Sequence, residues 1–265
     1  MLIQIDLRTF VHSPAASSNP LLVLIGPPGE ILITTPLASL NLTPGGYEVI
    51  VASAVVADFT FTITPQGTVD FDPSFDSFLS GRGTSTLVVN GFEITFDARY
   101  LSGPTTLFVL PDALPVLHTT LRLLPAHSYG LEQGSGSVTP WPLTITREGK
   151  VDYAPAFDIA QNGFLAGRGT STLQLLGYPL LVDARASGAT SVGVQPTGNT
   201  TFSTTDVTFV ELLPTNEIAL QLDNHQVPFV LDLNGCFRVA PAQQPFVRFD
   251  RYHGLARMTV VAPPP

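Results

Sequence analysis

The segment GRGTSTL occurs twice in the chain, at residues 81–87 and at residues 167–173, each time within a longer repeated stretch. Residues 62–103 read TITPQGTVDFDPSFDSFLSGRGTSTLVVNGFEITFDARYLSG, and residues 144–188 read TITREGKVDYAPAFDIAQNGFLAGRGTSTLQLLGYPLLVDARASG. The triplet Asp-Ala-Arg follows GRGTSTL at the same distance in both stretches. Self-similarity of this length indicates an internal duplication, which predicts a repeated architecture.

The last part of the chain contains a third, more divergent copy. Residues 229–241, FVLDLNGCFRVAP, match residues 61–73 in their apolar positions, their glycine and their proline. Residues 254–261, GLARMTVV, are a weaker echo of GRGTSTLVV, and no Asp-x-Arg segment follows them. A segment of that form, IQIDLR, stands instead at residues 3–8.

The spacing of the Asp-x-Arg segments suggests a closed ring. Asp6, Asp97 and Asp183 lie 91 and 86 residues apart, and counting from Asp183 through the last residue to Asp6 gives 88. We therefore expect a single closed pseudo-threefold domain over residues 1–265, whose N-terminal strand completes the third unit and removes exposed sheet edges. The expected repeats are 9–99, 100–185, and 186–265 with 1–8. A six-bladed propeller with two blades per unit is the alternative.

Hydrophobic patterning predicts that every unit is built of β-strands. Phe59, Phe61 and Ile63 alternate with polar residues, as expected for a strand with one buried face. Gly67, Gly149 and Gly235 stand where hairpin turns need a positive φ. The fold class is all-β.

Composition excludes several classes of function. Charged residues make up only 12% of the chain, acids outnumber bases 21 to 12, and Lys150 is the only lysine. No basic cluster is present, so nucleic acid is not an expected partner, and a net charge of −9 favours a ligand with some positive charge. No apolar run is long enough to span a membrane, and residues 1–8 lack a secretory signal, which predicts a cytoplasmic protein.

Cofactor and metal motifs are missing from the sequence. It contains no GxGxxG, GxxxxGK, HExxH or CxxC motif, and its single cysteine, Cys236, permits neither a disulfide nor a cysteine-based metal cage. Asp70, Asp72 and Asp76 resemble a calcium-binding series, but the second copy has Ala154 in place of one of these aspartates. We expect neither a cofactor nor a metal.

The repeated GRGTST segments are the first candidate binding site. Glycines on both sides would let the backbone turn and present Arg82 and Arg168 to a carboxylate, with the hydroxyls of Thr84 and Thr170 close by. The structural alternative is that each arginine bridges neighbouring units, to Asp76 and Asp158 or to Asp97 and Asp183. Because the Asp-x-Arg residues lie two apart, their side chains share one face of a strand, and we expect a charged ring with an architectural role.

Two further candidates lie outside these motifs. Trp141, between two prolines, is either a binding platform for a ligand or a plug for the end of a barrel. Ionisable residues are concentrated in the third copy, where Arg251 and His253 are the predicted binding residues. A Cys/His/Asp nucleophile set is conceivable there, but its spacing matches no catalytic pattern. The ionisable residues of this copy are Asp223, His225, Cys236, Arg238, Arg248, Asp250, Arg251, His253 and Arg257.

With its repeated GRGTSTL and Asp-Ala-Arg segments, its many prolines and its nearly lysine-free composition, the chain resembles peptide-binding accessory proteins of ribosomal-peptide natural-product pathways, the crocagin type. The resemblance implies a peptide ligand and tailoring enzymes as partners. We therefore expect a non-catalytic peptide-binding protein. The alternatives are a cofactor-free cyclase or isomerase, and a lectin-like or structural binding module. Oligomeric state does not follow from the sequence.

Overall fold

The computed structural model describes residues 1–10, 21–51, 55–101, 107–110, 114–116, 118–133, 141–189, 192–196, 207–223, 225–252 and 255–261. Within these ranges the chain forms β-strands, turns and four single-turn 3-10 helices, so the expected all-β class is confirmed. Among the described residues, no helix has the length and apolar character needed to cross a membrane.

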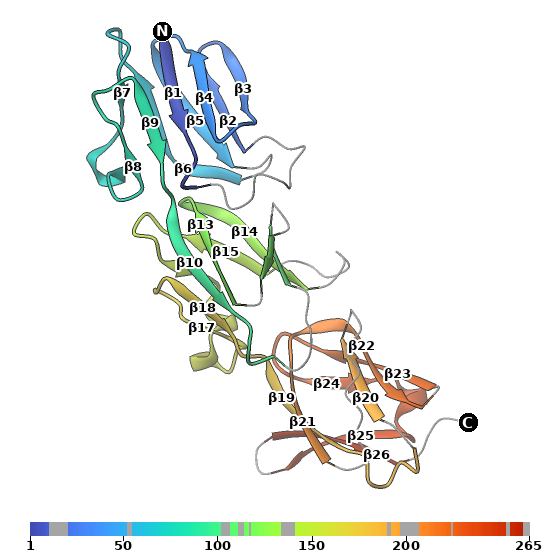
Figure 1. Ribbon diagram of the computed structural model, residues 1–265. Coiled ribbons are helices and arrows are strands. Elements are labelled where there is room, and N and C mark those ends of the chain that lie inside the picture. The colour runs from blue at the N-terminus through green and yellow to red at the C-terminus, as the bar shows by residue number, and fades with distance from the viewer. Residues whose placement is uncertain are drawn as a thin grey trace.

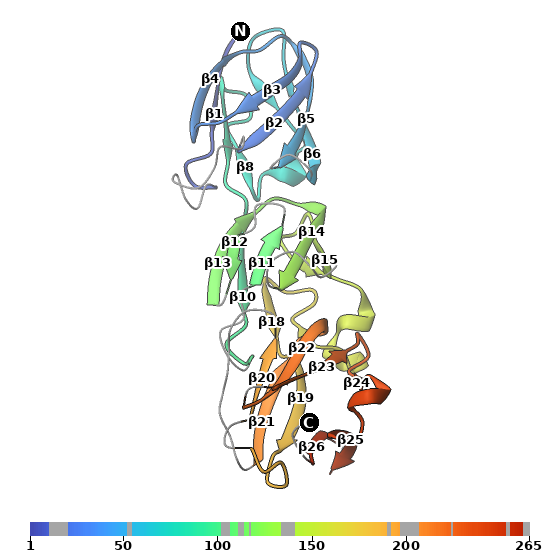
Figure 2. The ribbon, with the colours of Figure 1, turned by 90° about the vertical axis from the view of Figure 1, so that its right-hand side faces the viewer.

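Three units follow one another along an elongated molecule. We call residues 1–90 the first unit, residues 91–176 the second and residues 177–261 the third. The N-terminus lies at one end of the row and the C-terminus belongs to the unit at the other end (Figure 1), and the view turned by 90° shows the same order (Figure 2).

Each unit begins with one strand of its central sheet and ends with another. The elements of the first unit are β1 (Leu2–Asp6), β2 (Leu22–Gly26), β3 (Gly29–Ile33), β4 (Leu37–Asn41), β5 (Gly45–Val51), β6 (Val55–Ile63), β7 (Val69–Asp70), η1 (Pro73–Phe75), β8 (Leu79–Ser80) and β9 (Thr86–Val89). Those of the second are β10 (Phe92–Asp97), β11 (Leu107–Leu110), β12 (Leu114–Val116), β13 (His118–Leu123), β14 (Ala126–Gln133), β15 (Trp141–Ile145), β16 (Val151–Asp152), η2 (Pro155–Phe157), η3 (Ile159–Gln161), β17 (Leu165–Ala166) and β18 (Thr172–Leu175). Those of the third are β19 (Tyr178–Asp183), β20 (Val192–Pro196), β21 (Val207–Leu212), β22 (Thr215–Leu222), β23 (His225–Leu231), β24 (Phe237–Val239), η4 (Pro241–Gln243), β25 (Val247–Tyr252) and β26 (Leu255–Val260).

The same pairing pattern recurs in all three units. The first strand of each unit lies between an antiparallel neighbour and a parallel one: β1 between β4 and β9, β10 between β13 and β18, and β19 between β21 and β26. A second sheet in each unit contains a hairpin whose turn holds Gly67, Gly149 or Gly235 at φ 78, 70 and 74°. These values confirm the positive φ predicted for the three glycines.

The expectation of a closed ring is wrong. β1 pairs with β4 and β9 in the first unit, so it does not complete the third, and all the sheets of the described residues are open. The row in Figures 1 and 2 likewise gives no support to a six-bladed propeller. The near-equal intervals between Asp6, Asp97 and Asp183 have another cause, because an Asp-x-Arg strand that begins each unit of an open row produces the same spacing.

Aromatic rings fill the space between consecutive units. In the first unit, Phe78 packs against Phe59 with ring centroids 5.2 Å apart, and against Phe92 at 5.1 Å. Because Phe92 is the first residue of β10, this contact joins the first and second units. Phe164 of the second unit contacts Tyr178, the first residue of β19, at 5.8 Å in the same way. Burying rings of this size is a large apolar contribution to each junction.

The first junction is also joined by a strand pairing. Ala126 of β14 pairs with Ala57 of β6, and the Asp58 backbone N–H donates to the Pro125 carbonyl at 2.8 Å. His127 Nε2 lies 2.6 Å from an Asp58 carboxylate oxygen. A continuous sheet therefore runs from the first unit into the second.

Candidate functional site

The Asp-x-Arg pairs close on themselves as local ion pairs. Arg99 donates from Nε and Nη2 to the two carboxylate oxygens of Asp97 at 2.9 and 2.7 Å, and its backbone N–H donates at 3.2 Å. Those side-chain hydrogen bonds hold the pKa of Asp97 down at about 2. The pairs Asp6–Arg8 and Asp183–Arg185 have the same geometry.

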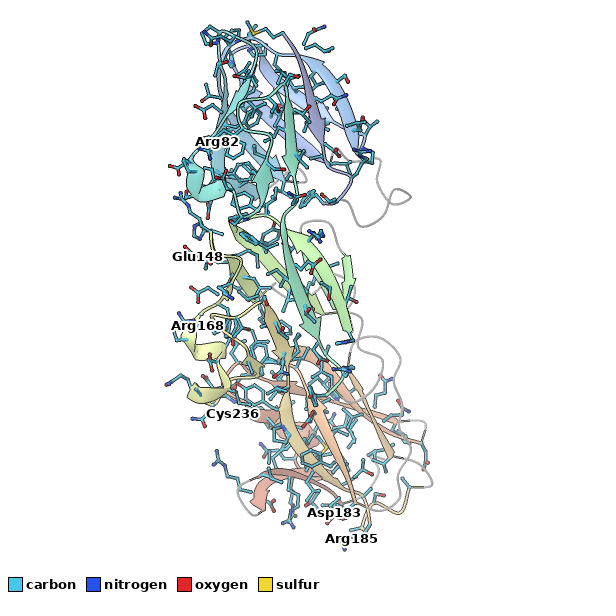
Figure 3. The ribbon with its side chains drawn as sticks, turned by 60° about the vertical axis from the view of Figure 1, so that its left-hand side comes forward. Arg82, Glu148, Arg168, Asp183, Arg185 and Cys236 are labelled. Atoms are coloured by element: carbon cyan, nitrogen blue, oxygen red, sulfur yellow. The ribbon has the colours of Figure 1, made fainter. Side chains whose placement is uncertain are left out.

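The expected charged ring is therefore wrong. Each Asp-x-Arg pair belongs to a different sheet, because β1, β10 and β19 are the central strands of three separate sheets. Figure 3 shows Asp183 and Arg185 together at one end of the molecule. Each of these strands ends at its aspartate, and the arginine lies in the turn that follows, from which its guanidinium reaches back to the carboxylate. The pair therefore stabilises its own strand end.

The GRGTST loops use their hydroxyl groups internally. The Thr84 hydroxyl donates to the Gly81 carbonyl at 2.7 Å and accepts from the Thr86 backbone N–H at 3.1 Å. Gly81 has a φ of 98°, and a Cβ built there would lie 1.9 Å from the Thr86 carbonyl oxygen. Thr170 repeats the arrangement in the second unit. The loop therefore needs these residues for its own conformation, which is enough to explain why GRGTST occurs in both units.

The arginines of these loops are paired within their own units. Arg82 Nη2 lies 2.7 Å from an Asp76 oxygen, and Arg168 Nε lies 2.6 Å from an Asp152 oxygen. Arg82 therefore pairs with one of the aspartates expected for it, but neither arginine bridges two units. Arg82 and Arg168 lie along one side of the row, in different units (Figure 3), so they do not come together as one site.

Trp141 is a core residue. Its side chain is 4% exposed, and its ring contacts Phe164 in an edge-on arrangement at 5.0 Å. It occupies in the second unit the place that Phe59 has in the first, where the partner is Phe78. The interpretation of Trp141 as an exposed binding platform is wrong, because the ring faces the interior.

The third unit departs from the other two at the GRG position. β25 and β26 pair at six positions from Val247–Val260 to Tyr252–Leu255, whereas β8–β9 and β17–β18 each pair at two. A regular hairpin thus replaces the GRG loop. His253, one of the two binding residues predicted here, lies outside the described residues.

The second unit departs from the first by an insertion. Phe75 and Phe78 are three residues apart, whereas the matching Phe157 and Phe164 are seven apart, so the second unit has four additional residues. They form η3, which Asp158 caps by accepting a hydrogen bond from the Ala160 backbone N–H at 2.9 Å. The turn ends at Asn162 with a left-handed φ of 62°.

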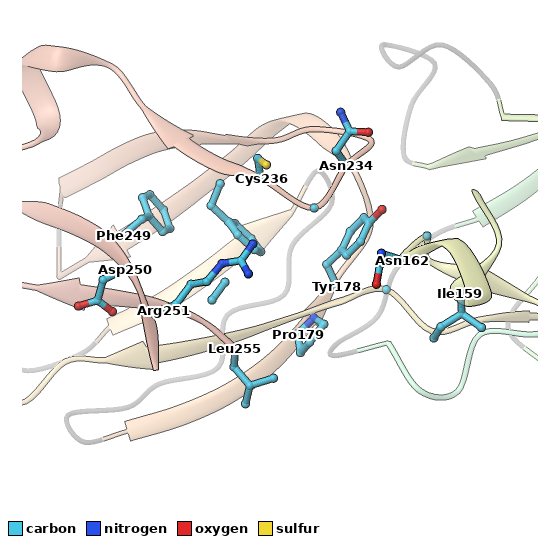
Figure 4. A pocket seen from close by; sticks show the side chains of 15 residues that line it. Ile159, Asn162, Tyr178, Pro179, Asn234, Cys236, Phe249, Asp250, Arg251 and Leu255 are labelled. Carbon is cyan, nitrogen blue, oxygen red and sulfur yellow. The ribbon is translucent and has the colours of Figure 1, made fainter. Parts of the chain in front are cut away.

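Both departures line the same groove, which lies between the second and third units. The groove is open, has a volume of about 740 Å³, and is shown in Figure 4. Its walls include Ile159 and Asn162 from the insertion, Asn234 and Cys236 from the turn before β24, and Phe249 and Arg251 from β25.

Arg251 contributes the positive charge of this groove. Its guanidinium points into the groove, and the neighbouring Asp250, which also lines the groove, directs its carboxylate away from Arg251 (Figure 4). Asp250 accepts a hydrogen bond from Arg257 Nε at 2.8 Å. Eight of the eleven arginines have a carboxylate oxygen within 4.0 Å. Among the described residues Arg251 has no such partner.

The remaining walls are aromatic, with hydrogen-bonding groups at their edges. Phe237 and Phe249 stack with centroids 5.7 Å apart and ring planes 17° apart. The Tyr178 hydroxyl donates to the Leu233 carbonyl at 2.7 Å, and burial raises the pKa of Tyr178 to about 12. Tyr178 therefore stays neutral, and the exposed thiol of Cys236 lies beside it in the groove.

The Cys/His/Asp nucleophile set is not assembled by the described residues. Cys236 and Asp250 both line the groove, but His225, at the start of β23, does not, and His253 lies outside the described residues. Within the described part of the chain, no group of three or more His, Cys, Asp or Glu side chains could hold a metal ion.

A smaller cavity of about 450 Å³ lies at the first junction, where Asp58, His127, Arg147, Glu148 and Asp152 are among its lining residues. Two of its acids are already paired, Asp58 with His127 and Asp152 with Arg168. No Phe, Tyr or Trp is among its lining residues, whereas Tyr178, Phe237 and Phe249 line the groove.

Arg251 was predictable from the sequence, but the opposite wall of its groove was not. The inserted residues Ile159 and Asn162 could have been noticed as the gap between two otherwise matching copies. The sequence does not show that these inserted residues face the third unit, because that depends on how the two units pack. Comparison with known proteins finds no family model, no curated protein and no solved structure that the chain matches.

Proposed function

We propose that this chain is a non-catalytic peptide-binding protein and that the groove between its second and third units is the binding site. The observation that carries the proposal is that the inserted turn of the second unit and the altered hairpin of the third unit line one groove. Residues shared by the repeats meet folding needs common to all units. Departures that converge on one place are best explained by a ligand.

An extended peptide fits this groove because β25 is an edge strand. β25 pairs with β26, and no described strand pairs with its other edge. Free N–H and C=O groups of an edge strand are a template for an added strand, and side-chain pockets beside the edge supply specificity. Phe249 and Arg251 lie two apart in β25 and so project from one face into the groove.

The structure gives less support to a lectin-like protein with equivalent binding sites in its repeated units than to a protein with one groove. A repeated site would need free groups in the GRGTST loops, and there Thr84, Thr170, Arg82 and Arg168 all have partners inside their own unit. A single asymmetric groove suits one ligand per chain.

We propose an accessory role in the biosynthesis of a peptide natural product, with tailoring enzymes as partners, in the cytoplasm. A reducing compartment keeps an exposed thiol such as that of Cys236 free. We also propose that the three units descend from one ancestral unit. Two matching GRGTSTL segments and three Asp-x-Arg strands at corresponding places support common descent.

Peptide selection with a blocked groove tests the proposal. A library of random twelve-residue peptides is selected against the chain carrying a bulky maleimide on Cys236, and against unmodified chain. The matched control is Cys236→Ser with Lys150→Cys, which places the same adduct at the equivalent exposed turn of the second unit, outside the groove. Peptides enriched on unmodified and control chains but not on the Cys236 adduct support the proposal. No enrichment, or equal enrichment on all three, contradicts it.

A further inference from the structure

Resting on the proposed function, we infer that the peptide bound in the groove carries a carboxylate, which the guanidinium of Arg251 binds. The starting observation is the distribution of charge pairs. Acids outnumber bases in this chain, and eight of its eleven arginines have a carboxylate within 4.0 Å. An arginine that lines a groove without such a partner is therefore unusual here.

The two other arginines without a carboxylate partner in the described residues lie elsewhere. Arg147 lies over the Phe75 ring at 5.7 Å, at the junction of the first and second units. Arg248 is exposed on β25 and does not line the groove. Of the three, only Arg251 lines the groove between the second and third units, whereas Arg147 lines the smaller cavity, which also holds Asp58, Glu148 and Asp152.

The chemistry of the guanidinium selects the ligand group. Its planar fork of N–H donors matches the two oxygens of a carboxylate, and such charge-assisted pairs are stronger than neutral hydrogen bonds. Phe249, two residues earlier on the same face, would lie beside an apolar part of the peptide. The site therefore fits a carboxylate next to an apolar side chain.

The net charge of −9 does not oppose this assignment. Charges more than about 8 Å apart are largely screened at physiological ionic strength. The acids nearest in sequence are engaged: Asp250 accepts from Arg257, and Asp232 pairs with Arg238 at 3.0 Å. Asp250 also lines the groove, but its carboxylate is hydrogen-bonded by Arg257, so the guanidinium of Arg251 is the group available to a ligand carboxylate.

A peptide has two sources of carboxylate, its C-terminus and its acidic side chains. The test uses peptides enriched by the groove in the selection described above. Each is made as the free acid, as the C-terminal amide, and with Asp and Glu replaced by Asn and Gln. Dissociation constants are measured by fluorescence anisotropy for the native chain, for Arg251→Gln, and for Arg248→Gln as the matched control on the same strand.

We expect loss of the relevant carboxylate to weaken binding to the native chain and to Arg248→Gln by about tenfold or more, the effect of losing one charged hydrogen-bonded pair. Arg251→Gln should bind all forms equally weakly. Loss on amidation identifies the terminal carboxylate, and loss on Asp/Glu replacement identifies a side chain. Arg251→Lys keeps the positive charge but lacks the planar fork of N–H donors. Its affinity for the peptide should lie between those of the native chain and of Arg251→Gln.

The inference is overturned if removing every carboxylate leaves affinity unchanged, or if Arg251→Gln behaves like Arg248→Gln. In either case the peptides still bind in the groove, and the proposed function stands. If the selection yields no groove-dependent peptide, the proposed function itself fails. Arg251 is exposed, so its variants should fold, and circular dichroism verifies this before affinities are compared.

Discussion

The ring of Tyr178 packs against the ring of Phe164 with centroids 5.8 Å apart and ring planes 52° apart. Tyr178 begins the third unit and Phe164 belongs to the core of the second, so this contact fixes the position of one unit against the other. Because Tyr178 also lines the groove, the geometry of the candidate site depends on this junction.

Replacement of Tyr178 by alanine should destabilise the chain. The side chain is buried, and loss of a buried aromatic ring costs about 3–5 kcal/mol of the free energy of unfolding. Tyr178→Phe keeps the ring and loses the hydrogen bond to Leu233, at a cost of about 1 kcal/mol. Urea unfolding measures both, with Tyr100→Phe, at an exposed tyrosine, as the control. Equal stability of all three variants would show that the junction does not depend on this ring.

Gly81 and Gly83 should respond differently to alanine. Both have positive φ, which costs an alanine roughly 1–2 kcal/mol, but only Gly81 has the Thr86 carbonyl oxygen 1.9 Å from the position of a new Cβ. Nothing lies within 4 Å of that position at Gly83. Gly81→Ala should therefore lose clearly more stability in thermal unfolding than Gly83→Ala. Equal losses would contradict the loop geometry.

Arg82 and Arg168 should be dispensable for ligand binding. Their partners Asp76 and Asp152 are half exposed, and surface ion pairs contribute about 0–1 kcal/mol each. The double variant Arg82→Ala with Arg168→Ala should bind the selected peptides as the native chain does, measured by anisotropy. A stepwise loss of affinity would show that the peptides bind at the GRGTST loops.

Acid should weaken the fold through the Asp-x-Arg pairs. The pKa of Asp97 falls from its ordinary value of 3.8 to about 2 because Arg99 hydrogen-bonds its carboxylate, and the pKa values of Asp6 and Asp183 are lowered for the same reason. A lowered pKa means that the unfolded chain binds protons first, so the contribution is complete above about pH 4 and is lost as pH falls towards 2.

Urea unfolding of Asp97→Asn between pH 4 and pH 2 checks this dependence. The variant should be less stable than the native chain at neutral pH, and its stability should fall less steeply over that interval. Asp70→Asn, at an exposed position, is the control and should keep the native slope. Parallel curves for Asp97→Asn and the native chain would show that the pair contributes nothing in this range.

The strands and turns of the fold could be predicted from the sequence. The open row of units could not, because the repeat intervals suggested a closed ring. Alternation predicted the strand that contains Phe59, Phe61 and Ile63, and all three side chains are buried. The same argument placed Asp97 and Arg99 on one face of a strand, but the strand ends at Asp97 and the two residues pair across the turn that follows. The repeat interval is the same whether an Asp-x-Arg strand is the first or the last strand of its unit. Only the strand pairing in the structure shows that it is the first.

The candidate site was only half predictable for a related reason. Arg251 stood out because ionisable residues are rare in this chain and are concentrated in its third unit. Trp141 looked exposed between prolines, although its alternation with Leu143 and Ile145 marks a buried strand face. The insertion around Asn162 is visible in the sequence, but its approach to β25 depends on how two units pack.

Hydrogen exchange with a selected peptide locates the ligand without altering the chain. Exchange of backbone amides is followed by mass spectrometry with and without saturating peptide. If the peptide binds in the groove, exchange should slow in residues 159–163, 234–237 and 247–252, which border the groove, and should be unchanged in the GRGTST loops at 81–86 and 167–172. Protection of those loops with no change along the groove would show that the peptide binds at the loops instead.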